Sequence, residues 1–137
     1  MKTVLTYGTF DLLHYGHIEL LKKAKDLADG GKLIVGLSSD EFNSSKGKES
    51  HLDYKKRKEL LEAIKYVDAV IPESTWEQKI TDIKEQNVDI FVMGNDWEGK
   101  FDELNQYCQV TYLPRTKSIS STSVKKAISL LRSIDFT

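Results

Sequence analysis

Short runs of β-branched and other apolar residues alternate along this chain with longer amphipathic segments. This alternation is typical of βαβ units, in which each helix crosses back over a parallel sheet. Because such crossovers are right-handed, the simplest closure is an α/β fold with a single doubly wound parallel sheet. The five strands of this sheet are predicted at Thr3–Tyr7, Lys32–Leu37, Ala69–Ile71, Ile90–Met93 and Val110–Leu113.

The segments between the strands predict helices with one apolar face each. The helices are expected at Tyr15–Leu27, at Asp53–Lys65, from a cap at Ser74 or Thr75 to Gln86, at Phe101–Tyr107, and from a cap at Ser120 or Ser121 to Arg132. The polar stretch Asp40–Leu52 indicates a mobile loop. Pro72 lacks a backbone N–H and is expected to close the third strand. Trp76 is expected to lie in the core or at a dimer interface.

The chain has 137 residues, with 20 Lys and Arg against 21 Asp and Glu, which predicts one domain over residues 1–137. A domain that binds nucleic acid usually carries an excess of basic residues, and this chain has none, so no nucleic-acid partner is expected. The longest apolar runs, Leu33–Leu37 and Ile90–Gly94, are too short to cross a bilayer, so no membrane insertion is expected. The single cysteine, Cys108, and an early glycine and charge favour a cytoplasmic protein without a signal peptide.

Three polar turns follow predicted strands, at Gly8–His17, Gly94–Gly99 and Arg115–Thr122. In an open parallel sheet, ligands bind beyond the carboxyl ends of the strands, where the strand order reverses. We therefore expect the three turns to converge on one site.

The first of these turns carries two histidines at the predicted start of a helix. His14 and His17 are three residues apart, so they lie on one face of the first helical turn. Unpaired N–H groups and the positive end of the helix dipole favour an anion at that place, and two imidazoles add further donors. A zinc site is the weaker interpretation, because only Asp11 lies close in sequence as a third ligand. The pattern therefore favours phosphate binding.

The segment GTFDLLHYGH, residues 8–17, resembles the HxGH signature of the nucleotidyltransferase superfamily, and RTKSISST, residues 115–122, is similar to its second motif. The turn MGNDWEGKF, residues 93–101, resembles that of the glycerol-3-phosphate cytidylyltransferase branch. The resemblance implies a Rossmann-like nucleotidyltransferase fold. It also implies that CTP and glycerol 3-phosphate are converted to CDP-glycerol and pyrophosphate for teichoic acid or a related polymer, with Mg²⁺ accompanying CTP, in a homodimer.

The same resemblance implies a role for each of the following site residues. Nucleotide binding is expected of Thr9, Phe10, Asp11, His14, Tyr15, Gly16, His17, Lys48, Lys65, Asp96, Arg115, Thr116, Ile119, Ser120, Ser121 and Thr122. Acceptor binding is expected of Lys46, Arg57 and Lys79, and catalysis of His14, His17, Lys46 and Arg115. Asp11 is expected to organise the site or a magnesium ion.

Two positions depart from the family pattern. Lys65 stands where the family carries Arg, and Lys cannot form the same bidentate fork. Ser118 replaces the glycine of the second motif. These departures leave glycerol 2-phosphate or another polyol phosphate open as the acceptor. The sequence is also compatible with an adenylyltransferase, with a transferase for ethanolamine or choline phosphate, and with a regulatory module that binds a nucleotide without transferring it.

The implied reaction needs no general base. A phosphomonoester is largely doubly ionised at neutral pH, since its second pKa is about 6. Its oxygen can therefore attack the α-phosphorus of CTP directly. Positioning and electrostatic stabilisation are expected to supply the catalysis.

Overall fold

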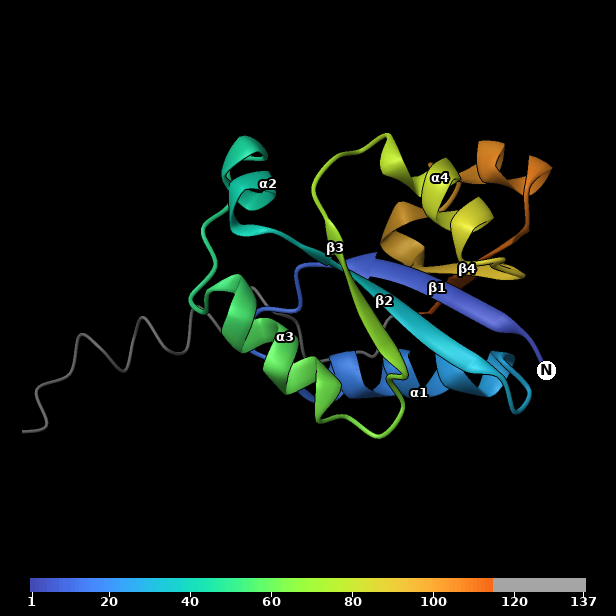
Figure 1. Cartoon of the computed structure of the whole chain (residues 1–137), viewed down its shortest axis with the longest axis horizontal. Coiled ribbons are helices and arrows are strands. Elements are labelled where there is room, and N and C mark those ends of the chain that lie inside the picture. Colours follow the sequence, from blue (N-terminus) through green and yellow to red (C-terminus); the bar gives the residue numbers. More distant parts are fainter. Residues whose placement is uncertain (115–137) are drawn as a thin grey trace, which may run out of the picture.

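The computed structural model describes residues 1–114, which form a parallel five-stranded sheet with helices on both faces (Figure 1). The strands are β1 (Thr3–Gly8), β2 (Lys32–Ser38), β3 (Ala69–Glu73), β4 (Ile90–Gly94) and β5 (Gln109–Leu113). Their order is β3-β2-β1-β4-β5, so the chain moves outward in one direction from β1 and then in the other from β4. The predicted doubly wound α/β fold is thus confirmed, with its switch point between β1 and β4.

Helices occupy both faces of the sheet. The α-helices are α1 (Tyr15–Leu27), α2 (Asp40–Ser45), α3 (Tyr54–Glu62) and α4 (Gln78–Glu85), and the 3₁₀ segments are η1 (Asn95–Trp97) and η2 (Asp102–Gln106). Figure 1 shows α1 and α3 on one face, and α4 with the two 3₁₀ segments on the other. No helix in residues 1–114 is both long and apolar enough to cross a membrane.

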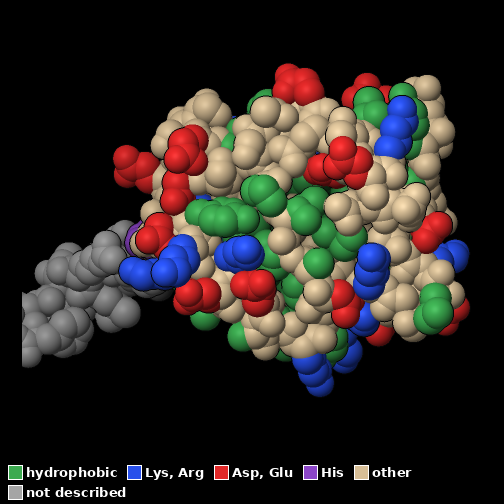
Figure 2. Space-filling model, viewed as in Figure 1, with side chains coloured by type: hydrophobic (Ala, Val, Ile, Leu, Met, Phe, Trp, Pro, Cys, Tyr) green, Lys and Arg blue, Asp and Glu red, His purple; other side chains and the backbone are tan. Residues whose placement is uncertain are grey.

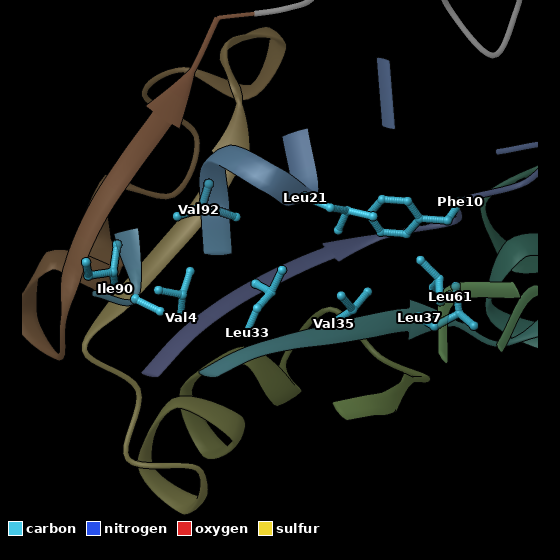
Figure 3. Packing of buried hydrophobic residues seen from close by; sticks show 11 residues of the cluster. Val4, Phe10, Leu21, Leu33, Val35, Leu37, Leu61, Ile90 and Val92 are labelled. Atoms are coloured by element: carbon cyan, nitrogen blue, oxygen red, sulfur yellow. The ribbon is translucent and has the colours of Figure 1, made fainter. Parts of the chain in front are cut away.

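The core has two layers because successive strand residues point to opposite faces. On the α1 face, Val4 of β1, Leu21 of α1 and Leu61 of α3 belong to one buried cluster (Figure 3). On the α4 face, Leu5 packs in a separate cluster with Phe91. Both faces of the central strands are therefore apolar, as expected for a parallel sheet covered on both sides.

The predicted mobile loop at Asp40–Leu52 is wrong over its first half, where α2 forms. The Ser39 hydroxyl accepts a hydrogen bond from the Phe42 backbone N–H at 3.1 Å and so caps this helix. Phe42 is buried, with 5% of its surface exposed. Its packing helps to hold a helix that the polar composition of the segment does not predict.

Other boundaries also differ from prediction. Pro72 does not close its strand, because β3 is an edge strand of the sheet. A proline is tolerated there when its nitrogen lies on the side away from β2, where no ladder hydrogen bond is needed. The helix predicted at 101–107 is the shorter 3₁₀ segment η2. Of the two predicted caps for α4, which begins at Gln78, Thr75 supplies the bond: its hydroxyl accepts from the Gln78 backbone N–H at 3.2 Å. The predicted helix from Ser120 or Ser121 to Arg132 lies outside the described residues.

Candidate active site

A cleft of about 540 Å³ opens beyond the carboxyl ends of β1 and β4, at the switch point of the sheet. Two of the three predicted turns meet there, at Gly8–His17 and Gly94–Gly99; the third, Arg115–Thr122, lies outside the described residues. The predicted site residues that line the cleft are Thr9, Phe10, Asp11, His14, Gly16, His17, Lys46, Lys48, Lys79 and Asp96.

The two predicted histidines cap α1 reciprocally. His14 is the N-cap residue, and its Nδ1 accepts a hydrogen bond from the Gly16 backbone N–H at 3.0 Å. In return, Nδ1 of His17 accepts from the His14 backbone N–H at 3.3 Å, and the two rings stack with centroids 4.0 Å apart. Because Nδ1 accepts in both rings, each neutral imidazole carries its proton on Nε2. The helix start therefore presents two N–H donors of fixed tautomer.

His17 is a neutral donor at physiological pH. The pKa of His17 is lowered to about 4, chiefly by burial and further by the neighbouring His14, while Asp11 partly opposes both effects. A neutral imidazole can still donate from Nε2 to a phosphate oxygen, without itself exchanging a proton. This matches a reaction that needs electrostatic stabilisation rather than a general base.

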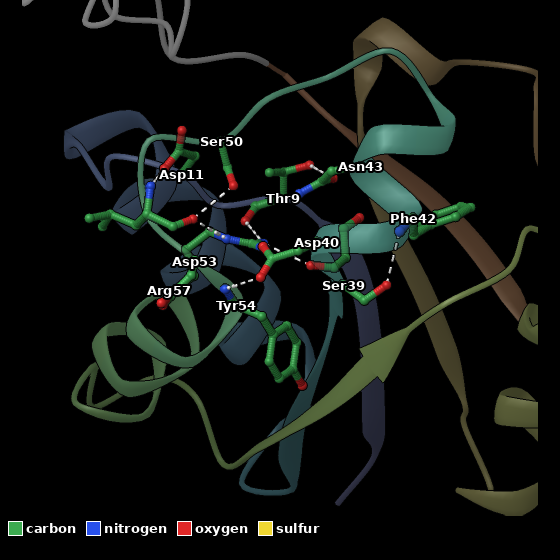
Figure 4. A network of polar contacts seen from close by, with 12 residues as sticks. Thr9, Asp11, Ser39, Asp40, Phe42, Asn43, Ser50, Asp53, Tyr54 and Arg57 are labelled. Carbon is green, nitrogen blue, oxygen red and sulfur yellow. Dashed lines mark hydrogen bonds and ion pairs between the residues drawn. The ribbon is translucent and has the colours of Figure 1, made fainter.

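A fully buried arginine holds the strand ends beneath the cleft (Figure 4). Arg57 donates to the backbone carbonyls of Thr9 at 3.0 Å, Ser38 at 2.8 Å and Leu52 at 3.0 Å, and to the Asp40 carboxylate at 2.7 Å. The Tyr54 backbone N–H, together with Arg57, lowers the pKa of Asp40. The guanidinium is thus engaged by protein acceptors. The structure gives Arg57 a supporting position and not the predicted contact with the acceptor.

Asp11 holds the segment that follows Lys48 against the first turn. Its carboxylate is buried, with 2% of the residue exposed. It accepts from the backbone N–H groups of His51 at 2.7 Å and Leu52 at 3.1 Å, and the His51 ring lies 3.4 Å away. This geometry favours the organising role predicted for Asp11.

The two predicted acceptor lysines converge on one buried carboxylate. Lys79 donates to Glu73 Oε2 at 2.9 Å, and Lys46 donates to the Ser38 hydroxyl at 3.1 Å. The Ser38 hydroxyl in turn donates to Glu73 Oε1 at 2.9 Å. Burial lowers the pKa of Lys46, and the Glu73 carboxylate opposes that shift. The sequence analysis did not identify Ser38 or Glu73 as site residues. Each is the last residue of a strand, and this position at the carboxyl edge of the sheet could have indicated them.

Trp76 is also part of the cleft, which corrects the expectation that it lies in the core. Its side chain is 48% exposed, lines the cleft and packs edge-on against Phe42 at 5.2 Å. Both Lys46 and Lys79 lie over its ring, at 5.4 and 5.0 Å.

Several predicted nucleotide-binding residues lie elsewhere. Lys65 is exposed after α3, with Nζ 5.2 Å from the Tyr66 ring, and does not line the cleft. Tyr15 is 58% exposed and also outside the cleft; a hydrogen bond with Glu19 raises the pKa of its hydroxyl. Six predicted residues lie outside the described range, namely Arg115, Thr116, Ile119, Ser120, Ser121 and Thr122.

The described part of the cleft is lined by three lysines and by the carboxylates of Asp11, Glu49, Glu73 and Asp96. The face shown in Figure 2 likewise intersperses Lys and Arg with Asp and Glu side chains. Lys46, Lys48 and Lys79 all line the cleft. In residues 1–114, no group of three or more His, Cys, Asp or Glu side chains could hold a metal ion.

Comparisons with known proteins agree with this geometry. A family model described as cytidylyltransferase-like matches residues 5–127. The chain is 59% identical over 131 residues to a glycerol-3-phosphate cytidylyltransferase of Bacillus spizizenii, covering 96% of this chain and 100% of that protein. It is 57% identical over 128 residues to the Staphylococcus aureus protein of the same name, covering 93% of this chain and 96% of that one. A solved structure of a lipopolysaccharide core biosynthesis protein from Thermoplasma volcanium superposes with a TM-score of 0.72 at 27% identity, covering 85% of this chain and 99% of that chain.

Proposed function

The chain belongs to the cytidylyltransferase-like family, and on this basis we propose that it transfers the cytidylyl group of CTP to glycerol 3-phosphate, giving CDP-glycerol and pyrophosphate. One observation carries the proposal: a single cleft joins two histidine donors at a helix start to two lysines linked to one carboxylate, one directly and one through a serine hydroxyl. The first pair suits the triphosphate of CTP, and the second suits the phosphate of the acceptor.

In the proposed reaction, a phosphate oxygen of glycerol 3-phosphate forms a bond to the α-phosphorus of CTP. The bond from that phosphorus to the bridging oxygen of the β-phosphate breaks, and pyrophosphate leaves with the electron pair. The Nε2–H groups of His14 and His17 donate to phosphate oxygens as negative charge builds there. Lys46 and Lys79 hold the acceptor phosphate close to the α-phosphorus, which offsets repulsion between the two polyanions. When bound with CTP, Mg²⁺ would neutralise part of the triphosphate charge.

The remaining roles follow from the resemblance. Lys48 and Asp96, which line the cleft, contact the nucleotide, and so do Arg115 and residues 116–122. We further propose that residues 1–137 are one cytidylyltransferase domain, that the protein is a cytoplasmic homodimer, and that the product serves teichoic acid or a related polymer. Light scattering of the purified protein tests the dimer.

Pyrophosphate release tests the reaction. The purified protein is given each of the four ribonucleoside triphosphates with Mg²⁺, combined with glycerol 3-phosphate, glycerol 2-phosphate, ethanolamine phosphate or no acceptor. Release is expected with CTP and glycerol 3-phosphate together, and not with either alone. Binding of CTP without turnover on any acceptor would overturn the proposal in favour of a regulatory module. Faster release with glycerol 2-phosphate would correct the acceptor.

A further inference from the structure

We propose that the ammonium group of Lys79 fills a cation-binding cage in the cleft, and that Lys79 thereby determines acceptor specificity by excluding phosphorylated amino alcohols. The specificity part rests on the transfer reaction proposed above. The cage itself rests on geometry alone.

Three aromatic rings and one carboxylate surround the ammonium. Nζ of Lys79 lies 4.7 Å from the centroid of the Tyr7 ring, 5.0 Å from that of Trp76 and 5.6 Å from that of Phe101. The Glu73 carboxylate closes the set at 2.9 Å. Lys79 is buried, with 5% of its surface exposed, so these contacts are largely shielded from water. Several aromatic faces around one cation are the means by which proteins recognise quaternary ammonium ligands.

This arrangement differs from the other lysine–ring contacts in residues 1–114. Lys65, Lys84 and Lys100 each lie over one ring, those of Tyr66, Tyr107 and Trp97. Lys46 lies over two rings, but its ammonium bonds to a hydroxyl. Within that range, Lys79 alone combines three rings with a carboxylate.

The cage belongs to the substrate cleft. Tyr7, Glu73, Trp76, Lys79 and Phe101 all line the cleft. An acceptor that carries its own ammonium group meets a cage already filled by a cation, so both volume and charge oppose it. A glycerol phosphate instead meets the Lys79 ammonium, which has N–H donors besides the one that bonds Glu73. These donors suit the oxygens of the acceptor. The same residue therefore favours the anionic polyol phosphate and rejects the zwitterionic amino alcohol phosphate.

Removing the Lys79 side chain should open the cage to a free cation. Lys79→Ala removes the four atoms beyond Cβ, and tetramethylammonium is about the size of the lost group. We expect tetramethylammonium chloride to bind Lys79→Ala about 10-fold or more tightly than the wild-type protein, since a shielded cation–π site contributes well over one decade in affinity. Binding is measured by Trp fluorescence titration, with Trp97→Phe in both backgrounds so that Trp76 is the reporter.

Two further variants control this measurement. Lys84→Ala removes a lysine from the same helix that lies over one ring, and it should gain no affinity for tetramethylammonium. Adding Glu73→Gln to Lys79→Ala removes the carboxylate of the cage and should abolish most of the gain. If Lys79→Ala is unfolded on its own, tetramethylammonium should restore its folded circular dichroism spectrum, because a ligand of the native state stabilises that state.

The second arm measures specificity. The ratio of kcat/KM for choline phosphate to that for glycerol 3-phosphate should rise at least ~10-fold in Lys79→Ala and stay unchanged in Lys84→Ala. Equal tetramethylammonium affinity of Lys79→Ala and wild type, or no rescue of an unfolded variant, would overturn the cage. Cation binding without a change in that ratio would overturn the specificity role. Because the binding arm uses no CTP, failure of the wild-type protein to release pyrophosphate would count against the proposed function and not against the cage.

Discussion

The backbone N–H of His14 donates a hydrogen bond to Nδ1 of His17 across 3.3 Å, which leaves the proton of the neutral His17 ring on Nε2. This link separates two roles of one side chain, since Nδ1 caps the helix while Nε2 is the phosphate donor in the proposed reaction. In His17→Asn, the side-chain oxygen can replace Nδ1 but no donor replaces Nε2–H. We expect His17→Asn and His17→Ala to lower kcat by ~10²-fold or more, the scale of losing one preorganised donor.

His17→Gln provides the matched control. Its terminal amide N–H can reach the position of Nε2–H, so it should recover part of the turnover lost in His17→Asn. Steady-state pyrophosphate release measures kcat, and circular dichroism checks that each variant is folded. Near-normal turnover in a folded His17→Ala protein would remove the assigned role.

The low pKa of His17 predicts how stability depends on pH. Its folded value is about 4, below the ordinary 6.5 of the unfolded state, so between those two values the unfolded chain binds more protons. Stability should therefore fall as pH drops from 6.5 to 4, with no contribution from this group above 6.5. We expect wild type to lose on the order of 2 kcal/mol more than His17→Asn over that window, measured by urea unfolding at fixed ionic strength. An equal loss in both proteins would contradict the buried neutral imidazole.

The strongest sequence periodicities predicted the structure best. The helix predicted at Tyr15–Leu27 has the same bounds as α1. Its apolar residues recur at a regular helical spacing, which is the strongest sequence signal for a helix. The segment Asp40–Ser45 carries no such face, and its helix depends on a cap from Ser39 and the burial of Phe42. The Ser39 cap is a local contact, but the burial of Phe42 is set by tertiary packing, which the sequence pattern does not show.

The site divides in the same way. The meeting of His14 and His17 at the start of α1 was predictable, since residues three apart lie on one face of a helical turn. The Glu73–Lys79 pair links a strand end to a helix six residues later, and neither helical nor strand periodicity brings these residues together. Arg57 lies among exposed lysines on a basic helix, so charge alone could not distinguish its buried role from contact with an anionic substrate.

Arg57 should matter for stability, because its guanidinium bonds the backbone of three separate segments. In Arg57→Lys a single ammonium cannot reach all of these acceptors, and buried carbonyls lose their partners. We expect a loss of about 3 kcal/mol in the free energy of unfolding, measured with urea. The neighbouring Lys56 is exposed, and Lys56→Gln should change that free energy by less than about 0.5 kcal/mol. Unchanged stability but a raised KM for glycerol 3-phosphate in Arg57→Lys would restore Arg57 to the acceptor site.

Gly36 lies in β2 and Gly94 in β4. The space around each glycine predicts that substitution by alanine is harmful at Gly36 and tolerated at Gly94. A Cβ at Gly36 would lie 2.2 Å from Cδ1 of Tyr7, its register partner on β1, whereas a Cβ at Gly94 would meet no atom within 4 Å. Gly36→Ala must therefore displace the Tyr7 ring, which overpacks the core, and we expect a loss of about 2 kcal/mol on urea unfolding. Gly94→Ala should change that value by less than about 0.5 kcal/mol.

The Gly36 substitution should also affect the site, because Tyr7 supplies the ring centroid that lies 4.7 Å from the Lys79 ammonium. Displacing this ring moves one wall of the cleft next to the acceptor lysines, while the histidine caps of α1 remain in place. A folded Gly36→Ala protein should therefore raise KM for glycerol 3-phosphate more than KM for CTP. Equal changes in both constants would mean that Tyr7 supports the whole cleft and not the acceptor end.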